Sequence, residues 1–171
     1  MKNWQLSRVL ITIGLLVFIS ACVRGRGEIT SEEVLEHGIP TEYLTCERTG
    51  TLARPDTQMI GPNGGRLRSG NSEVTIPSRA VPDQRRFVFS VVPGDTVGVI
   101  IDAGGPMHFN NRSARLIIDT SHCSASDLEN DEGWWVWRIV RRGESQKLST
   151  IMTPVRAITQ IDSTSVFMIA N

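Results

Sequence analysis

Residues 87–92 read Phe-Val-Phe-Ser-Val-Val, a run of β-branched and aromatic residues that ends at Pro93-Gly94-Asp95. Such residues favour β-strands, and the Pro-Gly-Asp sequence favours a turn. Further runs of the same type are expected to be strands: Val74–Ile76, Val97–Ile101, Arg115–Ile118, Trp135–Val140 and Val166–Ile169. Short strands separated by turns predict an all-β fold, an antiparallel β-sandwich, with a barrel as the lesser alternative.

One short helix is expected, ahead of the sandwich. Thr30 is a candidate N-cap, and Glu33 stands three residues later, as a capping box requires. Gly38 and Pro40 are typical of the end of such a helix. We expect the helix to lie in a tether that spans residues 22–45, followed by the sandwich over residues 46–171.

The N-terminal residues have the composition of a secretory signal peptide. Lys2 and Arg8 precede an apolar run from Val9 to Phe18, and Ile19-Ser20-Ala21-Cys22 follows. The apolar run is too short to cross a hydrocarbon core of about 30 Å. Residues 1–21 are therefore predicted to be removed from the mature chain.

The sequence Ile19-Ser20-Ala21-Cys22 resembles the bacterial lipobox. The resemblance implies that the Cys22 thiol receives a diacylglycerol and that a dedicated peptidase cuts before it. Two or three acyl chains anchor a protein to a membrane stably. The alternative is an ordinary signal peptide, cut near Ala21, that leaves Cys22 unmodified.

The expected location is therefore the cell envelope, with the chain held by its lipid. Val23 follows the cysteine, where an aspartate is associated with inner-membrane retention. An outer-membrane location is expected if the organism has an outer membrane.

The charge balance gives no sign of a nucleic-acid partner. The chain has 18 basic and 18 acidic side chains, and removal of Lys2 and Arg8 with the signal peptide leaves a small negative charge. Nucleic-acid binding usually requires a strongly basic surface. Nucleic acid is accordingly excluded as a partner.

Cys46 and Cys123 remain once Cys22 is lipidated. Exported proteins meet an oxidising compartment, so a Cys46–Cys123 disulfide is expected, with two buried thiols as the alternative. The disulfide would close a loop of more than about 70 residues, for which chain-entropy models predict a stabilisation of about 4 kcal/mol. His122 beside Cys123 is a weak zinc signal without a second pair of ligands, and neither a metal nor another cofactor is expected.

Four stretches combine glycine, proline and apolar residues in a recognisable order. Ile60–Leu67 contains a Gly-Pro-Asn-Gly-Gly turn, and an Ile-Pro corner follows in Val74–Pro82. Gly105–Phe109 and Ala114–Ile118 come later in the chain. Together these motifs resemble the ZU-five domain shared by ankyrins, netrin receptors and zonula occludens proteins. The resemblance covers roughly residues 59–171 and implies a β-sandwich interaction module.

This chain departs from the family pattern at two places. Ser78 and Arg79 stand where the corner has proline and glycine. Some family members cleave themselves at a His-Phe-Ser sequence near the last strand, but the corresponding stretch here is Ile161–Phe167, which lacks the histidine. His108-Phe109-Asn110 lies in a different segment and has asparagine in place of the serine. No enzymatic activity and no catalytic residue are therefore expected.

Trp134, Trp135 and Trp137 form an unusual local concentration of aromatic residues. In a strand, Trp135 and Trp137 would face one side and Trp134 the other. Exposed indoles bind sugars or partner proteins, whereas a central strand that is apolar on both faces would bury them. An exposed pair beside a groove would favour glycan binding, and three buried indoles would remove its basis.

The sequence thus predicts a membrane-anchored lipoprotein that presents a β-sandwich as an interaction or structural module. The expected partners are the membrane, through the lipid, and an unidentified protein of the envelope. The alternative is a glycan- or cell-wall-binding module that uses the strand from Trp134 to Trp137.

Overall fold

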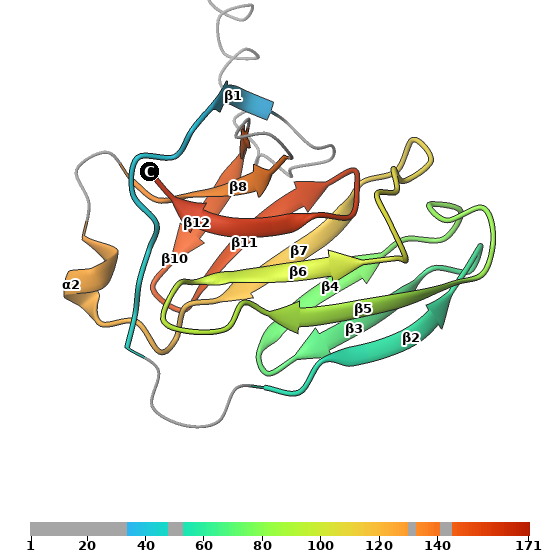
Figure 1. Cartoon of the computed structure of the whole chain (residues 1–171), viewed down its shortest axis with the longest axis horizontal. Coiled ribbons are helices and arrows are strands. Elements are labelled where there is room, and N and C mark those ends of the chain that lie inside the picture. Colours follow the sequence, from blue (N-terminus) through green and yellow to red (C-terminus); the bar gives the residue numbers. More distant parts are fainter. Residues whose placement is uncertain (1–33, 48–52, 130–132, 141–144) are drawn as a thin grey trace, which may run out of the picture.

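The computed structural model describes residues 34–47, 53–129, 133–140 and 145–171. The chain forms two antiparallel sheets that pack face to face, with a short helix at one end (Figure 1). The seven-stranded sheet has the order β1 (Val34–Gly38), β9 (Ser145–Leu148), β8 (Trp135–Ile139), β12 (Val166–Ala170), β6 (Gly98–Asp102), β5 (Arg85–Val91) and β2 (Asp56–Ile60). The five-stranded sheet has the order β10 (Thr150–Thr153), β11 (Arg156–Ile161), β7 (Ala114–Asp119), β4 (Ser72–Ile76) and β3 (Gly65–Ser69). The predicted β-sandwich is confirmed.

The core lies between the sheets because apolar residues recur at every second position. In β4, Ser72, Val74 and Ile76 are buried while the residues between them are half-buried. The same period of two places Phe87 and Phe89 of β5 in the core. Alternation of this kind puts one face of each strand against the opposite sheet.

All six runs that the sequence predicts as strands contain a strand: β4, β5, β6, β7, β8 and β12. The sequence did not predict β2, β3, β9, β10 and β11. These strands are short or rich in charged and polar residues, as in the Arg66-Leu67-Arg68 segment of β3 and the Gln146-Lys147 pair of β9. Their positions depend on pairing with neighbouring strands rather than on local propensity.

The predicted N-terminal helix is wrong over Val34–Gly38, which is strand β1. β1 pairs antiparallel with β9, with Val34 opposite Leu148 and Gly38 opposite Ser145. Hydrogen bonding to a sheet edge outweighs a capping signal that few helical residues could follow. The first part of that helix, from Thr30, lies outside the described residues.

Residues 34–45 also belong to the folded unit, so the predicted boundary at Cys46 falls inside the sandwich. The Leu44 amide donates to the carbonyl of Ile169 at 2.8 Å, and the Val97 amide donates to the carbonyl of Leu44 at 2.9 Å. Leu44 is fully buried. The segment after β1 therefore continues along the end of the seven-stranded sheet, as Figure 1 shows.

The predicted Gly-Pro-Asn-Gly-Gly turn joins β2 to β3. The Gly64 amide donates to the Gly61 carbonyl at 2.9 Å, and Gly64 has a φ of 71°. A Cβ atom at Gly64 would lie 2.4 Å from the carbonyl oxygen of Ile76. Only glycine fits there, because both the backbone conformation and the close approach exclude a side chain.

The described residues contain a single helix, α2 (Ala125–Leu128), which the sequence did not predict. In this part of the chain, no helix has both the length and the apolar character needed to cross a membrane.

Candidate functional site

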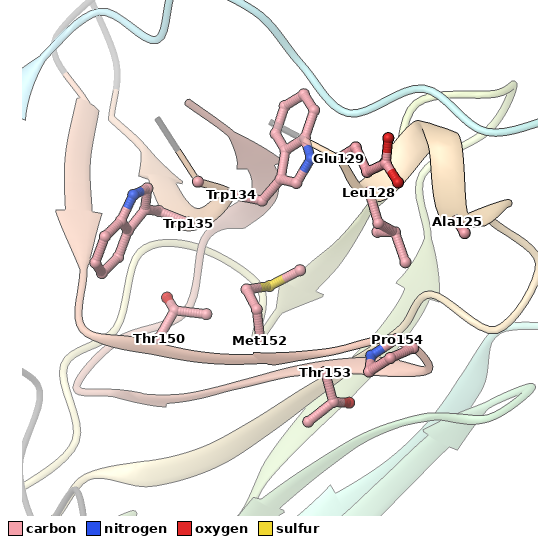
Figure 2. Close-up of a pocket in the computed structure, with 10 residues that line it drawn as sticks. Ala125, Leu128, Glu129, Trp134, Trp135, Thr150, Met152, Thr153 and Pro154 are labelled. Carbon is pink, nitrogen blue, oxygen red and sulfur yellow. The ribbon is translucent and has the colours of Figure 1, made fainter. Parts of the chain in front are cut away.

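A groove of about 580 Å³ opens at the end of the sandwich where the two sheets approach α2 (Figure 2). We call it the tryptophan groove. Its lining residues come from α2, from the start of β8 and from β10: Ala125, Leu128, Glu129, Gly133, Trp134, Trp135, Thr150, Met152, Thr153 and Pro154. Figure 2 shows Thr150 and Met152 extending from one wall toward Trp134 and Leu128 on the other. The lining is mainly apolar.

A capping box holds α2 at one wall of the groove. The Asp127 amide donates to Ser124 Oγ at 3.2 Å, and the Ser124 amide donates to Asp127 Oδ2 at 2.7 Å. These reciprocal bonds satisfy two amides of the first turn, which lets a helix of four residues form. Leu128 then packs against the core and faces the groove.

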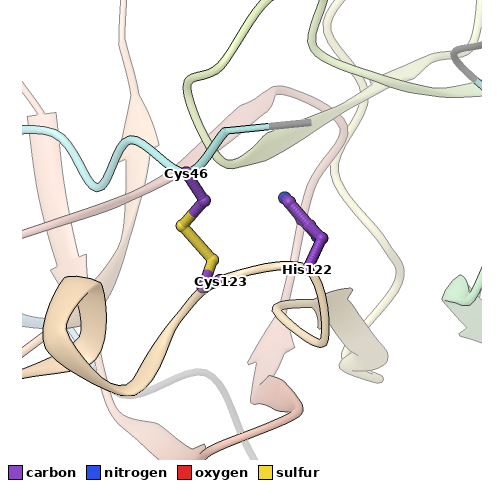
Figure 3. A group of neighbouring side chains, drawn as sticks. All are labelled: Cys46, His122 and Cys123. Atoms are coloured by element: carbon purple, nitrogen blue, oxygen red, sulfur yellow. A yellow bond between two sulfur atoms is a disulfide. The ribbon is translucent and has the colours of Figure 1, made fainter. Parts of the chain in front are cut away.

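A disulfide fastens the same wall to the rest of the sandwich (Figure 3). Cys46 and Cys123 are bonded, with S–S 2.04 Å and Cα atoms 4.9 Å apart, so the predicted pairing is confirmed. Cys46 ends the segment that runs along the seven-stranded sheet, and Cys123 directly precedes the N-cap of α2. The bond therefore ties the helix that lines the groove to the N-terminal segment.

His122 lies beside this disulfide. The ligand atoms of Cys46, His122 and Cys123 lie within 4.8 Å of one another, the close arrangement seen in Figure 3. A cysteine binds zinc as the thiolate, and both sulfur atoms are joined to each other here. In the oxidised protein this cluster therefore offers a metal ion only the imidazole.

Trp134 and Trp135 are half-buried and line the groove, but neither indole nitrogen has a hydrogen-bond partner among the described residues. Both nitrogens are buried. A buried donor without an acceptor costs about 1–3 kcal/mol. Such groups are rare in folded proteins.

Trp137 is structural. It is 3% exposed, and its indole nitrogen donates to the carbonyl of Ala170 at 3.2 Å. Lys147 lies over the neighbouring Trp135 ring, with Nζ 4.8 Å from the ring centroid. The structure therefore divides the three predicted tryptophans: Trp134 and Trp135 line a groove, while Trp137 belongs to the interior.

β10 forms the opposite wall and begins at a hydroxyl that bridges two strands. Thr150 Oγ1 donates to the carbonyl of Leu148 at 2.8 Å and accepts from the Val136 amide at 3.0 Å. These bonds lie where the chain leaves β9 in one sheet and enters β10 in the other. Thr150 thus satisfies backbone groups at the point where the sheets separate.

A second hollow adjoins the tryptophan groove and shares Trp134 and Glu129 with it. Its lining is mainly polar and includes three carboxylates, from Glu42, Asp127 and Glu129. We call it the acidic hollow. The two hollows together form one continuous surface, apolar on the Trp135 side and acidic on the Glu42 side.

His108 and Ser163 are brought together, although they lie far apart in the sequence. They form an isolated antiparallel bridge, and His108 Nδ1 lies 4.0 Å from Asp162 Oδ1. Ser163 Oγ, however, accepts a hydrogen bond from Arg138 at 2.6 Å. A guanidinium cannot take a proton from a hydroxyl, so this contact does not activate the serine as a nucleophile.

Arg138 is 8% exposed, and Ser163 is not its only hydrogen-bond partner. It also bonds Asp162 and the side-chain oxygen of Gln146. Buried charge requires such partners, which gives this cluster a structural role at the ends of β8 and β9.

Sequence reasoning found Trp134 and Trp135 but missed Leu128 and Met152, which complete the groove. Neither residue belongs to a motif, and each comes from an element that the sequence did not predict. Cys22 lies outside the described residues.

No known protein family matches the chain, and no curated protein shows significant sequence similarity to it. The resemblance to the ZU-five domain therefore rests on the quoted motifs alone.

Proposed function

We propose that this chain is a lipid-anchored lipoprotein of the cell envelope that presents its β-sandwich as a binding module. The lipobox-like sequence that ends at Cys22 supports the anchor. The groove lined by Trp134 and Trp135 supports recognition of a protein partner at the end of the sandwich. The hydrogen bond from Arg138 to Ser163 supports a non-enzymatic role.

One observation carries the proposal: two indole N–H groups without acceptors stand beside an apolar groove. The two indole N–H groups lose their bonds to water on folding and gain no protein acceptor among the described residues. A ligand that covers the apolar lining and supplies hydrogen-bond acceptors forms the bonds that the two indole N–H groups lack in the free protein. The indoles must turn toward the groove to reach such a ligand, because their nitrogens are covered in the free protein.

Thermal unfolding of the full chain, purified in detergent, tests the proposal. A ligand that binds only the folded state raises the melting temperature. We expect a protein fraction of the envelope to raise it for the natural sequence and not for Trp135→Ala. Met59→Ala is the control, because Met59 is 58% exposed on β2, away from the groove. Equal stabilisation of Trp135→Ala and the natural sequence would place recognition elsewhere.

Glycan binding is the second candidate, and the half-buried indoles at the groove favour it. Indole faces stack on sugar rings, and sugar hydroxyls accept hydrogen bonds. A peptidoglycan fragment that raises the melting temperature of the natural sequence but not of Trp135→Ala would select this alternative.

A further inference from the structure

β10 is an unprotected edge of the five-stranded sheet. It pairs with β11 on one side, and no described strand pairs with its other side. The remaining edge strands, β1, β2 and β3, each contain a charged residue, whereas β10 reads Thr-Ile-Met-Thr. Charges on an edge oppose the addition of another strand. β10 lacks that protection and offers the outward backbone groups of alternate residues.

The tryptophan groove reaches this edge. Met152 and Thr153 are consecutive, so their side chains lie on opposite faces of the sheet, yet both line the groove. Figure 2 shows these two side chains pointing in opposite directions from β10. The groove therefore runs beside the strand and not only over one face of it.

The outer face of the same sheet continues an apolar row to β10. Ile117 pairs with Ile158, and Ile158 pairs with Ile151, which places three isoleucines side by side on neighbouring strands. Ile151 ends the row at the edge and is 46% exposed. A strand added to β10 would place one set of side chains beside Ile151 and the alternate set in the groove.

The charge of the acidic hollow predicts which kind of side chain stands at one end of such a strand. The acidic hollow, lined by Glu42, Asp127 and Glu129, continues directly from the groove. Carboxylates around one end of a binding surface favour a cationic group there and reject an anionic one.

We infer that the tryptophan groove binds an extended segment of a partner protein, apolar on both faces and basic at one end, as an added strand on β10. The strand's backbone bonds the free edge, an apolar side chain fills the groove, and its Lys or Arg lies in the acidic hollow. The Trp134 and Trp135 indoles turn to donate to carbonyl or side-chain oxygens of the segment. This inference rests on the proposed function, because it names the occupant of the same groove.

Synthetic peptides of about eight residues, a usual strand length, test this with the full chain in detergent. Each peptide consists of Val, Ile and Thr, with two Lys at either the N- or the C-terminus. One control is methylated at alternate backbone nitrogens, which removes the donors needed for strand pairing, and a second control has Glu in place of Lys. Binding is measured by tryptophan fluorescence.

We expect one Lys peptide to bind and its methylated form to bind at least about tenfold more weakly. Ile151→Lys, which adds a charge to the edge, is expected to weaken binding similarly, while Met59→Lys on the edge strand β2 leaves it unchanged. Glu129→Lys should restore binding of the Glu peptide. Circular dichroism establishes that each variant is folded.

Four results would overturn the inference. Equal binding of the methylated peptide would exclude strand addition. Dimerisation of the chain without peptide, abolished by Ile151→Lys, would assign the edge to a second copy. Binding of a peptidoglycan fragment instead of any peptide, lost in Trp135→Ala, would keep the groove as the recognition site and change its ligand. Peptide binding that survives both Trp135→Ala and Ile151→Lys would overturn the proposed function as well.

Discussion

Arg79 adopts a backbone conformation that glycine favours. It has a φ of 67° at the corner between β4 and β5, and its amide donates to the Pro62 carbonyl at 2.7 Å. A left-handed conformation costs a residue with a side chain roughly 1–2 kcal/mol. Arg79 is also the position where the resembled family motif has glycine, so this residue stores strain that the motif avoids.

Arg79→Gly is therefore expected to raise the free energy of unfolding by up to about 1 kcal/mol, since part of the relief is offset by the greater entropy of unfolded glycine. Chemical denaturation measures the change. Gly64→Ala is the opposite case and should lower stability by more than this, because its Cβ would meet the Ile76 carbonyl. A clear loss of stability in Arg79→Gly would show that the arginine side chain makes a compensating contact.

In the β3–β4 hairpin, the carboxylate of Glu73 pairs with two arginines. Glu73 is 12% exposed and lies 3.1 Å from Arg66 Nε and 2.6 Å from Arg68 Nε. Burial raises the pKa of Glu73, but hydrogen bonds and the positive charges of Arg66 and Arg68 lower it by more. The net effect holds the pKa of Glu73 below its usual value of 4.5. The folded state thus favours the ionised carboxylate.

This shift predicts the sign of a pH dependence. A lowered pKa contributes stability above the unfolded value, and that contribution is lost as pH falls below about 4.5 and through the folded-state pKa. Glu73→Gln should remove this part of the acid sensitivity. Denaturation at pH 7 and at low pH measures it. The expectation fails if the natural sequence and Glu73→Gln lose stability in parallel on acidification.

The disulfide ties the N-terminal segment to the residue that precedes the N-cap of α2. Replacement of both Cys46 and Cys123 by serine is expected to lower the free energy of unfolding by up to about 4 kcal/mol, and to weaken ligand binding because α2 loses its covalent tie. Denaturation and the peptide titration measure the two effects. In protein from its native compartment, alkylation of both thiols without prior reduction would contradict the bond.

The sequence predicted the central strands and the disulfide because those features are local or have one economical solution. Six strands carry β-branched runs, and Cys46 has one partner once Cys22 is set aside. The remaining strands, the helix α2 and the groove depend on contacts between distant segments. Met152 illustrates this: nothing near it in the sequence indicates that β10 becomes a sheet edge opposite Trp134.

At the scale of the whole molecule, the anchor should place the sandwich at a membrane surface. A palmitate analogue is expected to label the protein, and Cys22→Ala should abolish both the labelling and maturation, because the Cys22 thiol is the proposed site of lipid attachment. Gel fluorescence and intact mass measure this. A mature chain that begins with an unmodified residue other than Cys22 would contradict the anchor.

The central claim is that the end of the sandwich lined by Trp134 and Trp135 is the recognition site. Nuclear magnetic resonance of the indole N–H groups tests it most directly, because the proposed removal of the signal peptide would eliminate Trp4 and leave Trp134, Trp135 and Trp137. Addition of the Lys peptide should move the Trp134 and Trp135 signals and leave Trp137, which already donates to Ala170, in place. Unchanged Trp134 and Trp135 signals in a chain that binds the peptide would contradict the account.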